Sequence, residues 1–247
     1  MISNSNKGLP TTLFEAVNAA TNVVVLVLMN EIQCQDICFD PTEENLLDLL
    51  PGGCLVILSS TVTAAWVKEA HLLFNKKGIH VDCPTSGGPV RTRSGDLTLM
   101  ASGDDKSLEI ARPLLECMGS DIHIIQGGAG MGSTVKMVHQ LLAGVHVCAA
   151  AEARALAAAA GIDVSQLHEI VNGAAGASWM FRDRGQRMIQ STDNVKSSLD
   201  FFVKDLGIVF EEAKRLQAPI PLASMALQQF IIGQALGLSR KDDSQVV

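Results

Sequence analysis

The stretch GGAGMGSTVKMVHQ, residues 127–140, decides how this chain folds. Its four glycines allow a sharp backbone turn after the short run from Ile122 to Ile125, and Ser133 or Thr134 can cap a helix by accepting its free amide protons. The stretch therefore predicts a loop that leads directly into a helix. On that helix Lys136, His139 and Gln140 have i, i+3, i+4 spacing, which puts an amine, an imidazole and an amide on one face.

The position of Lys136 bears on its pKa. It lies near the helix N-terminus, where the macrodipole disfavours a cation, and burial would lower the pKa in the same direction. A lysine in this position can exchange a proton near neutral pH. Spacing alone fits a solvated lysine beside a core histidine equally well, and that arrangement is the more common one.

Composition excludes several classes of protein. With 247 residues, 47% of them hydrophobic, the chain can form one large or two smaller domains. A net charge of -7 without a basic run argues against nucleic acid and against an anionic membrane surface as partners. The apolar run Val23 to Met29 is too short to cross a bilayer, and charged residues interrupt the helix expected over 133–160, so we expect no membrane segment.

The six cysteines show neither a CxxC pair nor a Cys/His ligand pattern. The sequence therefore predicts no metal site and no disulfide framework. The first ten residues lack the apolar segment of a secretory signal. Reduced thiols and a cytoplasmic location are expected.

Residues 1–125 alternate between strand and helix patterns. The expected strands are 22–29, 54–58, 78–82, 97–101 and 122–125, and the expected helices are 11–20, 43–50, 63–77 and 106–117. The first strand is a β-branched run of the kind that is buried on both faces. This alternation predicts a doubly wound, Rossmann-like α/β sheet.

Residues 126–247 contain helix patterns only. We expect helices at 133–160, 164–172, 179–189, 206–216 and 221–236, with the first of them joining the two domains. Alanines between 149 and 160 favour close helix packing, which a second subunit could also provide. The chain is thus expected to be an α/β domain followed by an all-helical C-terminal domain.

A dinucleotide-binding sheet normally opens with strand, GxGxxG and helix, and no complete GxGxxG occurs in this sequence. The glycines at 127–132 come closest, but the third position of the motif is Ser133. We therefore expect an incomplete Rossmann-like sheet that is short at its N-terminus.

A second loop, residues 82–89, follows an expected strand, at the edge where open α/β sheets bind ligands. The hydroxyl of Ser86 and the approachable amides of Gly87 and Gly88 suit a carboxylate, although a plain turn would use the same residues.

Four ordered runs carry a resemblance to a known family: residues 82–88, 95–103, 130–136 and 204–207. Together they resemble the β-hydroxyacid dehydrogenases, the family of 3-hydroxyisobutyrate dehydrogenase, whose C-terminal domain is like that of 6-phosphogluconate dehydrogenase. Residues 136–146, 177–181, 202–205 and 242–244 are most similar to the L-threonate dehydrogenase branch. Many relatives have asparagine at the position of His139, so this histidine points to the same branch.

The resemblance implies oxidation of a small hydroxy acid with NAD or NADP, and Lys136 as general acid/base. It implies that the substrate is bound by Ser86, Gly87, Gly88, His139 and Gln140, and the cofactor by Leu28, Met29, Gln33, Thr61 and Lys204. Family members are mostly dimers or tetramers formed through the helical domain. From the residues alone, Thr61 could instead cap the following helix, Lys204 could be solvated, and Asp205 and Asp242 are interpreted as structural.

One departure from the family leaves a second interpretation open. The family's first βαβ unit, with the glycine-rich turn that holds the pyrophosphate, is expected to be absent. The alternative to a dehydrogenase is therefore a non-catalytic fragment, or an oligomerisation module of a longer protein.

Overall fold

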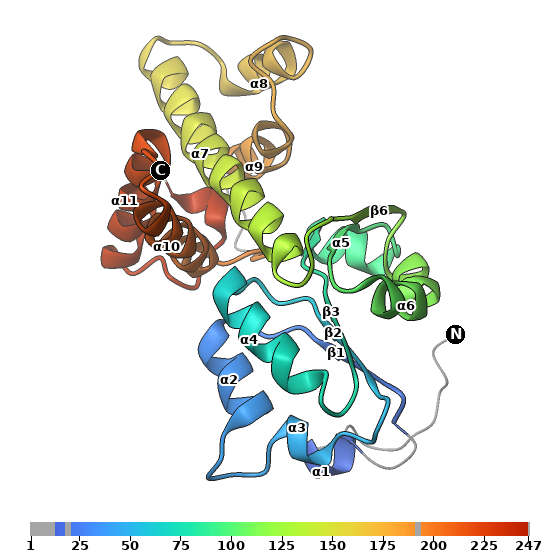
Figure 1. The fold of residues 1–247 in the computed structure, drawn as a ribbon. Helices are drawn as coiled ribbons and strands as arrows, with labels where there is room; N and C mark the ends of the chain where they lie inside the picture. The colour runs from blue at the N-terminus through green and yellow to red at the C-terminus, as the bar shows by residue number, and fades with distance from the viewer. Residues whose placement is uncertain (1–12, 18–20, 191–193, 247) are drawn as a thin grey trace. The chain divides into compact units, whose positions relative to one another are not determined.

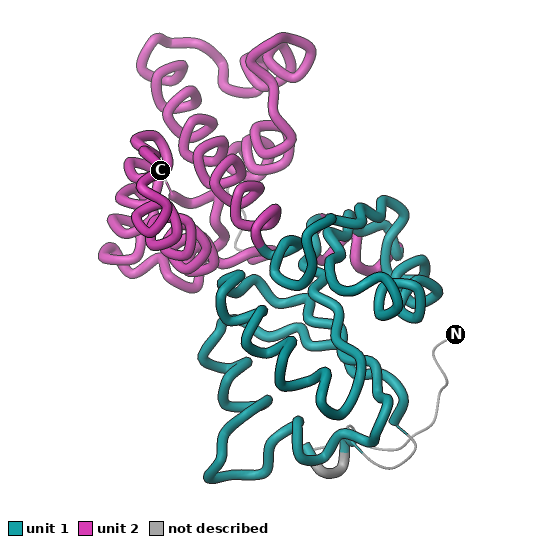
Figure 2. The backbone as a smooth tube through the Cα atoms, viewed as in Figure 1, with its two compact units in different colours: residues 1–86, 95–133 teal, residues 87–94, 134–247 magenta. Residues whose placement is uncertain are grey.

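A computed structural model describes residues 13–17, 21–190 and 194–246 (Figure 1). The chain forms two compact units, which are described separately (Figure 2). Unit 1 comprises residues 1–86 and 95–133, and unit 2 comprises residues 87–94 and 134–247. The α/β fold class with a large helical C-terminal region is confirmed.

Unit 1 contains a parallel sheet in the order β1 (Val23–Leu26), β2 (Leu55–Leu58), β3 (Ile79–Asp82). Val24 pairs with Val56, and Val56 with His80. Helix α1 (Leu13–Ala16) precedes β1, the connection from β1 to β2 carries α2 (Glu31–Phe39) and α3 (Leu46–Leu49), and the connection from β2 to β3 carries α4 (Ala64–Phe74). Parallel neighbours require such crossovers, because a tight turn can join only antiparallel strands.

Strand β2 is buried on both faces, as its continuous apolar run predicts. Val56 and Leu58 belong to a core cluster with Cys38 of α2 and Phe74 of α4. The alternate residues Leu55 and Ile57 belong to a second cluster, which includes Leu108, Ala111 and Leu115 of α6 (Asp105–Met118). Helices therefore cover both faces of this strand.

The expectation that the first strand is buried on both faces is wrong. Val23 and Val25 of β1 are 41% and 40% exposed. They are in register with Leu55 and Ile57, on the face that α6 covers, but α6 packs on β3. Helix α6 therefore covers this face over β2 and β3, but it does not cover β1.

A second, mixed sheet consists of β4 (Thr85–Ser86), β5 (Thr98–Ala101) and β6 (Asp121–Ile124). Strand β4 is antiparallel to β5, and β5 is parallel to β6. A bridge between Asp82 and Ser102 links the ends of β3 and β5.

Three elements are absent from the expected pattern. Residues 82–89 were expected as a loop, but they contain β4 and the start of α5 (Gly88–Arg93), which Pro89 initiates. Helix α2 was not expected; the side chain of Asn30 caps it by accepting from the amide of Gln33. Its sequence mixes polar and apolar residues without a clear helical stripe, so periodicity gave little signal there.

Unit 2 is helical. Its elements are α7 (Met131–Ala159, whose first residues belong to unit 1), α8 (Val164–Asn172), α9 (Trp179–Gln190), α10 (Leu199–Leu216), α11 (Pro221–Ala235) and a 3-10 helix, η1 (Asp243–Gln245). Helix α10 begins at Leu199 rather than at the expected Leu206. The core contains Val147, Phe202, Leu206 and Phe230. Gly144 brings α7 close to α10, since an added Cβ would lie 2.8 Å from the side chain of Leu206.

Helix α7 is partly buried. Ala143, Val147 and Ala150 face the core, whereas Val138 and Leu156 are exposed. By length and composition α7 could cross a membrane, a test that core helices of globular proteins also pass.

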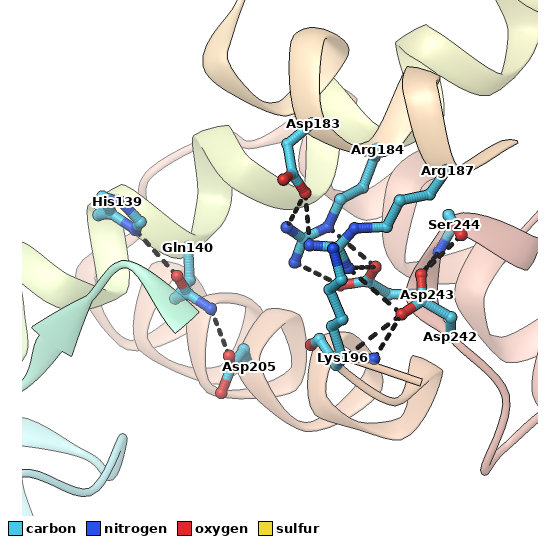
Figure 3. A network of polar contacts seen from close by, with 11 residues as sticks. His139, Gln140, Asp183, Arg184, Arg187, Lys196, Asp205, Asp242, Asp243 and Ser244 are labelled. Atoms are coloured by element: carbon cyan, nitrogen blue, oxygen red, sulfur yellow. Dashed lines mark hydrogen bonds and ion pairs between the residues drawn. The ribbon is translucent and has the colours of Figure 1, made fainter. Parts of the chain in front are cut away.

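A buried ion network fastens the C-terminal segment to α9 (Figure 3). Arg184 donates from Nε and Nη2 to the two carboxylate oxygens of Asp243, at 2.9 and 2.8 Å. Arg187 donates to Asp242 at 3.3 Å, and Asp183 contacts both arginines. Bidentate pairing supplies the hydrogen bonds that buried charges need. This arrangement accords with a structural role for Asp242.

Unit 1 also contains a histidine pair, with one buried member, that makes its stability depend on pH. His80 on β3 is fully buried, its Nδ1 lies 3.3 Å from Nδ1 of His71, and its ring stacks on Phe74. Burial, followed by the neighbouring His71, lowers the pKa of His80 to about 3. The unfolded state takes up this proton near pH 6.5, but the folded state does not.

We expect the free energy of unfolding to fall as the pH drops below about 6.5, by up to about 1.4 kcal/mol per pH unit from His80 alone. Urea unfolding between pH 4.5 and 7.5 measures this slope. His80→Phe keeps a flat ring against Phe74 and should flatten the slope, whereas His123→Gln, at an exposed position on β6, should leave it unchanged. Equal slopes for the wild type and His80→Phe would contradict the assignment.

Candidate active site

Three of the expected site residues lie within one turn of α7 in unit 2. Lys136 and Gln140 are buried, at 7% and 9% exposure, and His139 is partly buried. The expected helix and the shared face are therefore present. The turn is polar, although most of α7 is apolar.

Asp205 of α10 connects this turn to another expected residue. Its Oδ2 accepts a hydrogen bond from Nε2 of Gln140, and its Oδ1 forms an ion pair with Nζ of Lys204 at 2.7 Å. Gln140 Oε1 lies 2.9 Å from Nδ1 of His139 (Figure 3). The structure thus brings His139, Gln140 and Lys204 together around one carboxylate.

These contacts fix the hydrogen positions. A carboxylate can only accept, so the amide nitrogen of Gln140 must face Asp205 and its oxygen must face His139. Nδ1 of His139 is then the donor, and Nε2 is the acceptor of a neutral ring. Burial, followed by the charge of Lys136, lowers the pKa of His139, which favours the neutral form.

The environment of Lys136 changes its acidity. Burial lowers the pKa of Lys136 to about 8; the charge of Asp205 raises it and that of Lys204 lowers it. An ordinary lysine is almost fully protonated at this pH, whereas Lys136 populates both forms. The group can therefore accept or donate a proton near neutrality.

Asp205, interpreted from the sequence as structural, lies against Gln140 and so belongs to the site. Its position directly after Lys204 was the available signal, since a carboxylate beside a site lysine is a natural charge partner. Its bond to Gln140 spans 65 positions of sequence, which no local pattern indicates.

Four of the expected cofactor residues lie in unit 1, at the carboxyl ends of β1 and β2. The amide of Leu28 donates to the hydroxyl of Ser60 at 2.7 Å, and the amide of Met29 donates to Oε1 of Gln33 at 3.1 Å. Thr61 follows Ser60 directly. Helix α4 is capped by Thr63, which accepts from the amide of Trp66, so the alternative that Thr61 caps this helix is wrong.

This edge fits part of a dinucleotide. Open α/β sheets bind ligands at the carboxyl ends of their strands, and here Val27 and Met29, which follow β1, are 73% and 52% exposed. The pyrophosphate would need a glycine-rich turn, and the sequence contains no GxGxxG.

The three residues expected to hold the substrate carboxylate are consecutive. Ser86 ends β4, Gly87 precedes α5 and Gly88 begins it. Their backbone has φ values of 142° at Gly87 and 66° at Gly88. Other residues adopt this region at a cost, so both positions require glycine and leave the backbone approachable.

Comparison with known proteins identifies the family. Residues 5–128 match the model "NAD binding domain of 6-phosphogluconate dehydrogenase". Residues 130–247 match "NAD-binding of NADP-dependent 3-hydroxyisobutyrate dehydrogenase". The two matches cover nearly the whole chain.

Individual relatives agree with these matches. L-threonate dehydrogenase of Escherichia coli O6:H1 is 40% identical over 236 residues, covering 93% of this chain and 78% of the relative. That of Pectobacterium atrosepticum is 39% identical over 237 residues, covering 96% and 77%. A crystal structure titled 3-hydroxyisobutyrate dehydrogenase, from Salmonella typhimurium, has a TM-score of 0.86 at 40% identity, covering 92% of this chain and 79% of that one. The chain belongs to the 3-hydroxyisobutyrate dehydrogenase-like family of NAD(P)-dependent hydroxyacid dehydrogenases, whose substrates are small hydroxy acids.

Proposed function

We propose that this chain oxidises L-threonate, or a closely similar polyhydroxy acid, with Lys136 as the general base. The observation that carries the proposal is the buried Lys136, whose pKa lies at about 8, on the same turn as His139 and Gln140. Relatives that are 39–40% identical, over 77–78% of their own length, are named L-threonate dehydrogenase, which supports the choice of substrate.

In this reaction, neutral Lys136 takes the proton of the substrate hydroxyl as its carbon is oxidised to a carbonyl. NAD(P)⁺, when bound, supplies the acceptor for the hydride that leaves this carbon. Protonated Lys136 returns the proton in the reverse reduction. Proton transfer of this kind typically contributes about 10²- to 10⁴-fold to the rate.

The substrate would be held by two groups of residues. Ser86 and the amides of Gly87 and Gly88 bind its carboxylate, which the positive φ values of the two glycines make approachable. Nε2 of His139, an acceptor in the neutral ring, receives a hydrogen bond from a substrate hydroxyl. Gln140 acts mainly by holding His139, because both ends of its amide are engaged within the protein.

We assign the cofactor to Leu28, Met29, Gln33 and Thr61 in unit 1, together with Lys204. Residues 1–125 form the cofactor domain and residues 126–247 the helical domain in this proposal. All six cysteines are free thiols, which is compatible with the cytoplasmic location that we propose.

A homodimer or homotetramer formed through the helical domain is part of the proposal. Helix α11 is apolar around its circumference, yet Leu222, Met225 and Ile232 are 72%, 66% and 53% exposed. They recur at heptad-like spacing on one side of the helix, as at a helix-helix seam.

Replacing Lys136 with Ala should lower kcat for L-threonate oxidation by about 10²- to 10⁴-fold, since the base is lost. In the wild type, the rate should rise with pH through about 8 and then level off, because the neutral amine is the active form. The absorbance of the NAD(P)H formed, with L-threonate and with 3-hydroxyisobutyrate as substrates, measures both kcat and its pH dependence. Lys214→Ala, at an exposed position on α10, is the matched control and should keep full activity. Near-normal turnover by Lys136→Ala would refute the mechanism.

Replacing Asp205 with Asn should move the pH profile to lower pH. The carboxylate raises the pKa of Lys136, so its removal lets this pKa fall further below 8. Cofactor affinity should also weaken, because Lys204 loses its ion pair. Glu212→Gln removes a carboxylate of the same helix that pairs with Arg215, and it should leave the pH profile unchanged. A profile that is unchanged in Asp205→Asn would contradict this role.

Replacing Ile232 with Lys should reduce the mass of the assembly in solution, because a charge at an apolar seam is costly to bury. Light scattering coupled to size-exclusion chromatography measures it. Gln234→Lys, at an exposed polar position on the opposite side of α11, should leave the mass unchanged. A wild type that is monomeric at micromolar concentration would rule out the proposed assembly.

A further inference from the structure

The first turn of α7 is held by side chains that come from distant parts of unit 1. Oδ2 of Asp82, at the end of β3, accepts from the amide of Ser133 at 2.9 Å, and its Oδ1 accepts from the hydroxyl of Ser133 at 2.7 Å. Ser102, after β5, donates its hydroxyl to Asp82 Oδ2 at 3.0 Å. The same hydroxyl accepts from the amide of Gly132 at 2.9 Å. We call Asp82, Ser102, Gly132 and Ser133 the Asp82 clasp.

The clasp replaces a local helix cap. At α4, α6 and α8 the capping side chain lies three positions before the amide that it accepts from: Thr63 for Trp66, Asp104 for Ser107 and Asp163 for Gln166. At α7 the acceptors lie 51 and 30 positions away along the chain. Capping from a distance satisfies the free amides as a local cap does, and it also fixes where the helix begins relative to β3 and β5.

The clasp leaves little room for the helix to shift. All four residues of the clasp are buried. A Cβ on Gly132 would lie 2.2 Å from the carbonyl oxygen of Met100, so the helix backbone already touches the end of β5. Reciprocal backbone bonds between Asp82 and Ser102, at 3.0 and 2.7 Å, hold the two acceptors together.

A buried carboxylate is a costly way to cap a helix. Burial raises the pKa of Asp82, against the hydrogen bonds from Ser133 and Ser102, which lower it. Neutral acceptors such as Thr63 cap other helices of this chain, so stability alone does not require a buried charge here. Charge-assisted hydrogen bonds are short and directional, which suits the fixing of a position.

Lys136 lies three residues after Ser133, on the next turn of the same helix and on the same side. An error of about 1 Å in the placement of a catalytic group can cost about 10²-fold in rate. We propose that Asp82 is a positioning residue for Lys136: through the clasp it fixes the first turn of α7 and keeps Lys136 in its buried position. The catalytic consequence of this inference rests on the proposed function. The effect of Asp82 on the surroundings of Lys136 does not.

The test replaces Asp82 with Asn, which is of equal size, and follows Lys136 without requiring catalysis. Labelling with an amine-reactive reagent from pH 6 to 11, with mass spectrometry of the Lys136 peptide, gives the midpoint of its reactivity. The wild type should have a midpoint near 8. In Asp82→Asn the midpoint should rise towards the ordinary value of about 10.5, because a loosened first turn admits water to the amine. Loss of the negative charge alone would move the midpoint down, so the direction separates positioning from electrostatics.

Activity gives the second measurement. Turnover per cofactor-binding site should fall at least about 10-fold in Asp82→Asn, while KM changes less, since the lysine rather than the substrate contacts is displaced. Asp104→Asn makes the same chemical change at the local cap of α6 and is the matched control. It should lower the melting temperature but change neither the midpoint nor the turnover per site.

Ser102→Ala provides a second variant if Asp82→Asn does not fold. It keeps the carboxylate and removes the acceptor of the Gly132 amide, so a smaller upward shift is expected. An unchanged or lower midpoint in a folded variant would overturn the inference. If Lys136→Ala were active while Asp82→Asn raised the midpoint, the proposed function would fail, and the clasp would still hold the lysine in place.

Discussion

The carboxylate of Asp82 holds the start of the helix on which both units depend. Helix α7 begins in unit 1, where Asp82 and Ser102 accept its first amides, and it continues through the core of unit 2. The close contact of Gly132 with the backbone of Met100 means that no larger residue fits there. Lys136 follows Ser133 by three residues, so the proposed role of Asp82 acts over a single helical turn.

Electrostatics in unit 2 follow from burial rather than from a single charged neighbour. Lys136 is kept from full protonation mainly by desolvation, and Asp205 and Lys204 act on it in opposite directions. Asp205 is balanced in turn by its ion pair with Lys204 and by the amide of Gln140. Opposing charges and the hydrogen bonds of Gln140 to Asp205 and His139 thus accompany a buried lysine in one small region.

Much of the fold could be predicted from periodicity. Strand β2 was recognisable because it is buried on both faces and is apolar throughout, and α8 has the expected bounds of Val164–Asn172. Helix α2 and the short β4 were missed because one has a mixed pattern and the other pairs only through a distant strand. The exposed residues of β1 were missed because composition indicates that a strand can be buried, whereas burial requires an element that covers it.

The sequence by itself determined the family, the alternation of elements, the glycines at 87 and 88, and the helical face shared by Lys136, His139 and Gln140. These features depend on residues close together in the chain, where spacing and turn chemistry act directly. Only the tertiary structure placed Asp205 against Gln140 and Asp82 against Ser133. Such contacts join residues 65 and 51 positions apart, and they form because packing of whole elements brings buried polar groups to partners that they need.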